Sequence, residues 1–351
     1  MDLKRMVYRP WSWLLGGLVV VMVALGILEY EKRPVDVNNK NKVLVEIPPG
    51  MSFYEVPDLL YEKGILRLKS AFYWAALQKN AFRSLQAGEY ELSPSMSVNE
   101  VLEVLVKGLV KRYELVVPEG FNLFDIAMRL NRLGLCSATE FLQLAHSLEF
   151  LKRMGVESHS LEGYLFPDTY WFVKKTPVER IAETMIRRFW QVWNENGYGQ
   201  RAKAINMGVN EVLTLASIIE KETAILEERP LVSAVFWNRL KRGMPLQADP
   251  TVIYGLLSQG SPTKDTITTE DLRAQTPYNT YVLKGLPRGP ICNPGVKSIE
   301  AALFPADVPY LYFVAQANGS HHFSVALKEH NAAVSRYRRG ASVQDDNGRL
   351  P

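Results

Sequence analysis

The stretch LASIIEKETAILEERP, residues 215–230, places four glutamates directly behind an apolar run, and its spacing predicts a helix. Asn210 is a suitable N-cap, and Pro230 ends this helix or starts the next one. We expect one stripe of the helix to face the core, because its members recur at helical spacing. That stripe contains Val212, Leu215, Ala216, Ile219, Thr223 and Leu226.

Glu220 lies beside this stripe, with the small residues Ala216 and Ala224 one turn before and after it. An apolar flank disfavours the charged form of a carboxyl and raises its pKa, which is what a general acid needs near neutral pH. Glu220 is therefore the candidate catalytic acid. The alternative is a structural carboxylate that a backbone group or an arginine satisfies.

The other three glutamates receive different interpretations. Glu222 lies about 200° around the helix from Glu220, so the two cannot share one site, and it is expected to pair with Arg229 in a structural role. Glu228 falls on the far side of the helix and is expected to be solvated. Glu227 lies on the side of Glu220 but roughly 10 Å along the axis, as an outer group.

The first thirty residues predict a transmembrane helix. The chain has 351 residues, and none is charged from Pro10 to Leu28. About 18 apolar residues reach roughly 27 Å as a helix, close to the thickness of the bilayer core. We place a short tail at residues 1–10 and the transmembrane helix at residues 11–29.

A cleavable signal peptide is the alternative to a permanent anchor, since Ala24-Leu25-Gly26 is a small-x-small pattern. Basic residues stand on both sides of the span, so their count does not decide its orientation.

Composition excludes several classes of protein. The net charge of +4 comes without a dense basic run, which argues against a nucleic-acid partner. The two cysteines, Cys136 and Cys292, form no CxxC or Cys/His ligand pattern, so no metal site is expected. One disulfide and two free thiols both remain open.

An internal duplication organises the middle of the chain. After a polar linker at residues 30–42, residues 43–66 and 113–136 align at a constant offset of 70, and each copy predicts a strand, a Pro/Gly turn and a helix. Residues 85–108 add a strand and a helix to the first copy. We expect a small βα module at residues 43–110, which resembles LysM-like carbohydrate-binding modules; a packing or spacer domain is the alternative.

Residues 111–155 contain the second copy and are expected to join it to a catalytic domain at residues 156–340, where polar loops alternate with helices. Asn318-Gly319 between apolar runs predicts a hairpin, followed by a closing helix and a loose tail at residues 341–351. The fold class is therefore α+β: an N-terminal transmembrane helix, a LysM-like module, and a mixed α/β catalytic domain with a helical active-site segment.

Five ordered motifs resemble the endolytic murein transglycosylases of the MltG/YceG-like family. They are LEGYLFPDTY, LASIIEKET, LQADPTVIYG, TPYNTY and GLPRGPICNPG. One departure is Arg288, where the family pattern has a second proline. The resemblance implies a single-pass protein of the bacterial inner membrane, with residues 1–10 as a cytoplasmic tail and a periplasmic catalytic domain that cuts nascent glycan strands internally. It also implies that the catalytic acid is Glu220.

Polar and aromatic residues of the loops are expected to position the sugar or to brace the loops. These candidates for substrate binding are Glu162, Tyr164, Gln247, Asp249, Tyr254, Asn279, Tyr281 and Asn293.

One carboxylate is enough for lytic transglycosylation, because the C6 hydroxyl of N-acetylmuramic acid attacks its own C1 and gives a 1,6-anhydro sugar. No cofactor or metal is expected. Two alternatives remain: a non-catalytic peptidoglycan-binding scaffold, and a hydrolytic muramidase that uses Asp249 or Glu162 as a second carboxylate. The expected partners are glycan strands, the inner membrane, and peptidoglycan synthases or division proteins.

Overall fold

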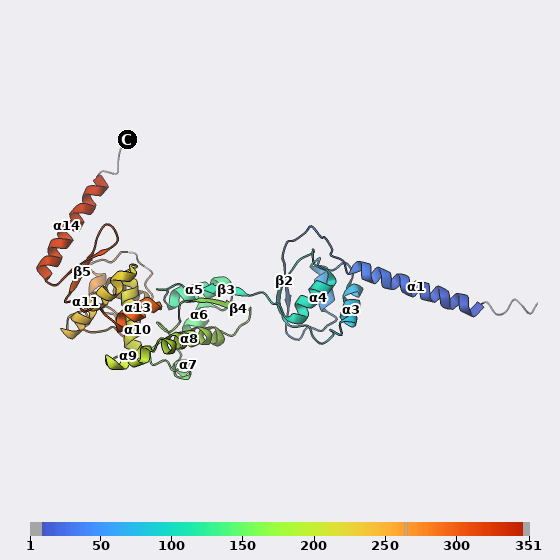
Figure 1. The fold of residues 1–351 in the computed structure, drawn as a ribbon, viewed down its shortest axis with the longest axis horizontal. Coiled ribbons are helices and arrows are strands. Elements are labelled where there is room, and N and C mark those ends of the chain that lie inside the picture. The colour runs from blue at the N-terminus through green and yellow to red at the C-terminus, as the bar shows by residue number, and fades with distance from the viewer. Residues whose placement is uncertain (1–8, 263, 265, 347–351) are drawn as a thin grey trace, which may run out of the picture. The chain divides into compact units, whose positions relative to one another are not determined.

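The structure is a computed structural model that describes residues 9–262, 264 and 266–346, and Figure 1 shows its helices and strands in chain order. The chain divides into two units between Tyr113 and Glu114, and Phe172–Lys174 belong to the first unit. Among the described residues, helices alternate with three two-stranded sheets, so the predicted mixture of helix and strand is confirmed.

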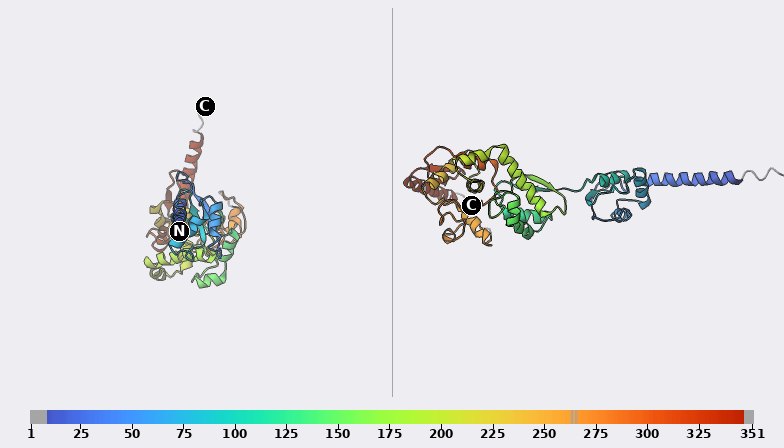
Figure 2. Two further views of the ribbon diagram at one scale, coloured as in Figure 1. Left: turned by 90° about the vertical axis from the view of Figure 1, so that its right-hand side faces the viewer. Right: turned by 90° about the horizontal axis from the view of Figure 1, so that it is seen from below.

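α1 (Arg9–Glu31) is the apolar helix predicted for residues 11–29, and Figure 2 shows it as one unbroken helix. The span Trp13–Glu31 has a mean hydropathy of 2.1 and is not buried, so its length and composition fit a membrane crossing. Most of the tail predicted for residues 1–10 lies outside the described residues.

The end of α1 is fixed to α3 (Lys69–Gln78) of the first unit. The Glu29 carboxylate accepts hydrogen bonds from Trp74 Nε1 at 2.9 Å and from Lys32 Nζ at 2.8 Å. The segment predicted as a polar linker, residues 30–42, therefore begins inside a helix that is packed against the first unit.

The first unit is built on an antiparallel pair of strands. Its other elements are β1 (Val43–Ile47), α2 (Val56–Glu62), β2 (Gly88–Leu92) and α4 (Val98–Lys107). Val43 lies opposite Leu92, and Ile47 lies opposite Gly88. Alternate strand side chains such as Val45 and Tyr90 are buried in a core that also contains Phe72 of α3.

The second copy of the duplication has the same local order as the first. β3 (Tyr113–Val116) is followed by a Pro/Gly turn and by α5 (Leu123–Leu133). α5 ends at Gly134, whose φ of 63° lies in the left-handed region that favours glycine. β3 pairs with β4 (Thr169–Phe172), whereas β1 of the first copy pairs with β2.

The rest of the second unit is mainly helical. Its elements are α6 (Ala138–Ala145), α7 (Leu148–Arg153), α8 (Val178–Glu195), α9 (Tyr198–Ala204), α10 (Val209–Glu222), the 3-10 turn η1 (Leu226–Glu228), α11 (Arg229–Lys241), α12 (Asp249–Ser258), the 3-10 turn η2 (Asp271–Arg273), α13 (Val296–Leu303), β5 (Tyr312–Ala315), β6 (His321–Ser324) and α14 (Leu327–Asp346). β5 and β6 form the hairpin predicted around Asn318-Gly319, and Gly319 has a φ of 83°. The tail predicted as loose from residue 341 continues α14 as far as Asp346.

α10 differs from the predicted amphipathic helix. All eight residues from Val212 to Ile219 are buried, because α11, α12 and α13 pack against it on different sides. The helix is capped at Gly208 rather than at Asn210, and Glu211 accepts a hydrogen bond from the Gly208 N–H at 2.7 Å. It ends at Glu222, and Pro230 lies in the first turn of α11, as one of the two expectations had it.

Candidate active site

Glu222 is the last residue of α10, and its carboxyl lines a cavity of about 280 Å³. The chain becomes extended at Thr223, with φ −142° and ψ 133°, so the helix stops immediately behind this glutamate. The other lining residues come from five segments of the second unit: α11, the start of α12, the loop that carries Tyr281, β5 and α14. They are Arg239, Leu246, Gln247, Asp249, Tyr281, Phe313 and His330.

The polar wall of this cavity is held in place by its own hydrogen bonds. The Tyr281 hydroxyl donates to Asp249 Oδ1, and the Gln247 N–H donates to the Thr280 carbonyl at 3.1 Å. Gln247 has a φ of 51°, a left-handed conformation that is uncommon for a residue with a side chain and that recurs at functional sites. Arg239 is buried and donates to the carbonyls of Leu246 and Leu311.

The cavity keeps the Glu222 carboxyl protonated near neutral pH. Burial and, to a smaller extent, the negative charge of Asp249 together raise the pKa of Glu222 to about 8, against the opposing effect of Arg239. Burial also raises the pKa of Tyr281, which stays a hydroxyl donor. A protonated carboxyl in an open cavity is the group that a general acid requires.

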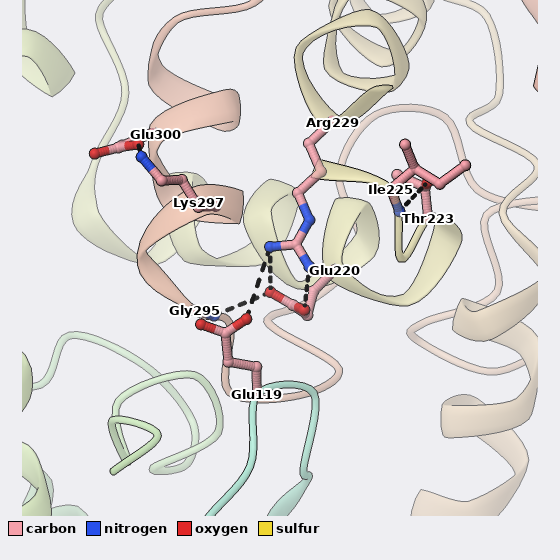
Figure 3. Close-up of polar contacts among 8 residues, drawn as sticks. All are labelled: Glu119, Glu220, Thr223, Ile225, Arg229, Gly295, Lys297 and Glu300. Atoms are coloured by element: carbon pink, nitrogen blue, oxygen red, sulfur yellow. Dashed lines mark hydrogen bonds and ion pairs between the residues drawn. The ribbon is translucent and has the colours of Figure 1, made fainter. Parts of the chain in front are cut away.

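Glu220 occupies a different environment, shown in Figure 3. Its Oε1 lies 2.9 Å from Nη2 of Arg229, and its Oε2 accepts from Arg229 Nη1 at 3.4 Å and from the Gly295 N–H at 3.0 Å. Each of these two side chains is only 6% exposed. The expectation of a carboxyl surrounded by apolar groups is therefore wrong, because the guanidinium and the amide occupy its hydrogen-bonding sites. The expected pair between Glu222 and Arg229 is also not formed.

The turn of the second repeat closes over this ion pair. Glu119 Oε2 lies 3.8 Å from Arg229 Nη1, and burial together with the charge of Glu220 raises the pKa of Glu119. A Cβ added at Gly295 would lie 1.9 Å from Glu119 Oε1, so a side chain at this position would displace the Glu119 carboxylate. Glu119, Arg229 and Glu220 thus form a charged cluster in which both Nη atoms of Arg229 contact carboxylates, while its buried Nε has no partner among the described residues (Figure 3).

Three of the residues predicted to bind substrate form a buried network instead. Glu162 accepts from Tyr254 Oη at 2.7 Å, from Asn293 Nδ2 at 3.2 Å and from the Leu123 N–H at 3.0 Å. Burial raises the pKa of Glu162 to about 8. The network joins the start of α5 to α12 and to the loop before α13.

Two further candidates are buried for other reasons. Tyr164 is 1% exposed and packs edge-on against Phe189, with ring centroids 5.2 Å apart. Asn279 donates to the Leu272 and Ala274 carbonyls and accepts from the Tyr281 N–H at 2.9 Å. Asn279 therefore shapes the loop that carries Tyr281, while Gln247, Asp249 and Tyr281 are the predicted residues that reach the cavity.

The helical wheel does not apply to the other two glutamates, Glu227 and Glu228, because α10 ends at Glu222, before either of them. Glu228 is not solvated: although burial opposes it, hydrogen bonds from the His321 backbone and ring lower the pKa of Glu228. Glu227 is exposed in η1. The β-branched Thr223 and Ile225 were the available sequence signal that the helix stops at Glu222.

Arg239, Phe313 and His330 were missed in the sequence, since nothing in their local pattern connects them to Glu222. Cys136 and Cys292 are free thiols. Within residues 9–262, 264 and 266–346, no cluster of three or more His, Cys, Asp or Glu side chains is placed to hold a metal ion.

Most of the chain is similar in sequence to known proteins. Residues 45–336 match the model of the YceG-like family. A Bacillus subtilis (strain 168) protein named endolytic murein transglycosylase is 34% identical over 321 residues, which cover 87% of each chain. A protein of the same name from Streptococcus pneumoniae serotype 2 is 31% identical over 335 residues, and the alignment covers 87% of this chain but 60% of the pneumococcal one.

The fold is also similar to that of a solved structure from the same family. The 2.6 Å crystal structure of a YceG-like protein from Listeria monocytogenes aligns with a TM-score of 0.58 at 36% sequence identity. The alignment covers 84% of this chain and 99% of the Listeria chain.

Replacing Arg229 by Met should lower the free energy of unfolding by about 3–5 kcal/mol, because the Glu220 carboxylate would stay buried without its partner. Arg187→Met is the matched control: Arg187 pairs with Glu183 at 2.6 Å but is 69% exposed, so its loss should cost less than about 1 kcal/mol. Chemical denaturation of the full chain in detergent measures both. Equal losses would contradict a structural role for the buried pair.

Proposed function

Because the chain belongs to the YceG-like family, we propose that it is an endolytic lytic transglycosylase that cleaves the glycan strands of peptidoglycan. The observation that supports this proposal best is the cavity that gathers a protonated carboxyl, Glu222, with Gln247, Asp249 and Tyr281. Amide, carboxylate and phenol groups around one acid are suited to holding the hydroxyls of a sugar. The proposed substrate, peptidoglycan, is inferred from the names of the relatives. The proposed acid catalysis is inferred from the residues that line the cavity.

Within this proposal Glu222 is the acid/base. The assignment of the acid to Glu220 remains a sequence-based prediction that the geometry does not favour, since Arg229 and the Gly295 N–H already occupy that carboxylate. The Glu222 carboxyl, with a pKa of about 8, holds a proton at pH 7 that it can donate.

In this reaction one side chain, Glu222, acts first as the proton donor and then as the proton acceptor. Glu222 donates its proton to the glycosidic oxygen as the bond from that oxygen to C1 of N-acetylmuramic acid breaks. The C6 hydroxyl of the same sugar bonds to C1, and its proton passes to the Glu222 carboxylate, which restores the acid. The products are a 1,6-anhydro end and a new 4-hydroxyl end. The intramolecular nucleophile is already close to C1, so no water has to be activated.

Hydrolysis is the second candidate, and one observation favours it: Asp249 lines the same cavity as Glu222. A second carboxylate could activate water in place of the C6 hydroxyl. Against this, the Tyr281 hydroxyl already donates to Asp249. Mass spectrometry of digested peptidoglycan separates the two, since transglycosylation gives anhydro ends and hydrolysis gives reducing ends. A chain that yields neither is a binding scaffold.

The proposal extends to the rest of the chain. We propose that the first unit is a LysM-like module that binds the glycan, which is supported by a cavity of about 350 Å³ at the Pro48–Met51 turn, with Phe53, Phe82 and Arg83 among its walls. We also propose that α1 anchors the chain in the inner membrane, with the second unit in the periplasm and synthases or division proteins as partners. Cysteine labelling from each side of the membrane tests the orientation.

Glu222→Gln should abolish cleavage, because the amide cannot donate the proton, while the unfolding transition stays close to that of the parent chain. Glu220→Gln should lower the free energy of unfolding. At a temperature where this variant is folded, it should still cleave peptidoglycan. Product formation from purified peptidoglycan, together with circular dichroism, measures both. If Glu222→Gln were fully active, or if Glu220→Gln were folded but inactive, the catalytic acid would be Glu220 instead.

The rate should depend on the protonation of Glu222. Its protonated form is the active one, so the rate should be steady below the pKa and fall as pH rises through about 8. Asp249→Asn removes a negative neighbour that raises this pKa, so the alkaline limb should move to lower pH even if the maximal rate drops. A pH–rate profile whose alkaline limb is the same in both chains would contradict the assignment.

A further inference from the structure

A second cavity of about 510 Å³ lies at the N-terminal end of α10. It is larger than the cavity of about 280 Å³ that Glu222 lines, and the proposed mechanism makes no use of it. It is lined by Ile205, Asn206, Met207, Asn210, Glu211, Thr214, Trp237, Leu240, Leu286, Pro287 and Arg288.

Two polar groups of this cavity have no hydrogen-bonding side-chain or backbone partner among the described residues. Asn210 Oδ1 is buried and makes no hydrogen bond with any described residue. An unsatisfied buried acceptor costs about 1–3 kcal/mol, so a donor from a ligand would stabilise it. The Arg288 side chain is exposed and forms no ion pair or hydrogen bond with the described part of the chain, although its charge acts on the nearby Tyr278 hydroxyl. This guanidinium is available to an anion.

The remaining walls suit small apolar groups. Met207, Leu240 and Leu286 are partly buried aliphatic side chains, and Trp237 is half-buried, with its Nε1 already donating to the Ala302 carbonyl at 2.9 Å. An apolar cavity with a few convergent polar groups is the usual form of a ligand site. The complementary ligand carries an N–H or O–H donor, small apolar groups and a carboxylate.

We propose that this cavity binds the peptide stem of the peptidoglycan strand, an inference that rests on the proposed function. A peptide stem combines backbone N–H groups, alanine methyls and free carboxylates, which match the unpaired Asn210 oxygen, the aliphatic wall and Arg288. A guanidinium binds a carboxylate through two parallel hydrogen bonds and holds its charge at all accessible pH values.

The two cavities lie within reach of one substrate. Tyr281 lines the cavity of Glu222 and Leu286 lines the second one, and five residues span at most roughly 18 Å of chain. The neighbouring residues Arg239 and Leu240 of α11 are likewise divided between the two cavities. A muramic acid held at Glu222 can therefore extend its stem to Arg288.

The experiment measures kcat/KM of the full chain in detergent on two substrates: strands that carry peptide stems, and the same strands after an amidase has removed the stems. Arg288→Gln should lower the ratio of stem-bearing to stem-free kcat/KM about tenfold, mainly through KM, as expected for the loss of one charged hydrogen-bonding pair. Lys284→Gln is the matched control, since it removes one charge from the same loop at an exposed position outside both cavities. It should leave the ratio unchanged.

An unchanged ratio in Arg288→Gln, or the same change in Lys284→Gln, would overturn the proposal. Calorimetric titration of Glu222→Gln with a soluble disaccharide-peptide gives a second measurement that needs no turnover. Adding Arg288→Gln should weaken that binding about tenfold, and equal affinities would again overturn it. If the parent chain cleaves neither substrate, the proposed function fails, while the titration still tests the cavity.

Discussion

The buried ion pair between Glu220 and Arg229 is the constraint on which the site geometry depends. It joins the last turn of α10 to the first residue of α11, and the Gly295 N–H adds the start of α13 to the same carboxylate. A buried pair of charges is tolerated only when the two groups are paired and hydrogen-bonded. Separating these three segments would therefore cost several kcal/mol of free energy. Glu222, two residues further on and about 200° around the helix, must therefore face the other way.

That separation explains why two glutamates only two residues apart have opposite properties. The Glu220 carboxyl accepts hydrogen bonds from the Arg229 guanidinium and from the Gly295 amide. Glu222 is buried near Asp249, and both effects favour the protonated acid. One helix end thus carries a structural anion on one side and a proton donor on the other. The helix stops at Glu222, which leaves this side chain at the cavity rather than along a packed helix face.

The duplication shows one local pattern used in two tertiary settings. In the first unit the strand of the repeat pairs with β2 and completes an independent core. In the second unit the same turn carries Glu119 against Arg229, and the helix that follows donates the Leu123 N–H to Glu162. The repeat sequence therefore specifies a strand, a turn and a helix, while the residues that differ between the copies specify what the turn contacts.

The sequence by itself determined the elements and the kind of chemistry. The apolar span of α1, the repeated βα order, the Asn318-Gly319 hairpin and a glutamate-bearing helix near residue 220 all follow from local patterns. Gln247, Asp249 and Tyr281 were found because their motifs are polar and rich in turn residues. These features depend on neighbours a few positions away in the chain.

Only the tertiary structure decided which glutamate meets the cavity. A helical wheel assumes one solvent-facing side, but α10 is buried on every side from Val212 to Ile219, so the wheel cannot rank the two glutamates that follow. The partners that distinguish them, Gly295 for one and Asp249 for the other, are distant in sequence. Burial and charge act through space, and for that reason the protonation of a carboxyl follows from the packing around it rather than from its place in a motif.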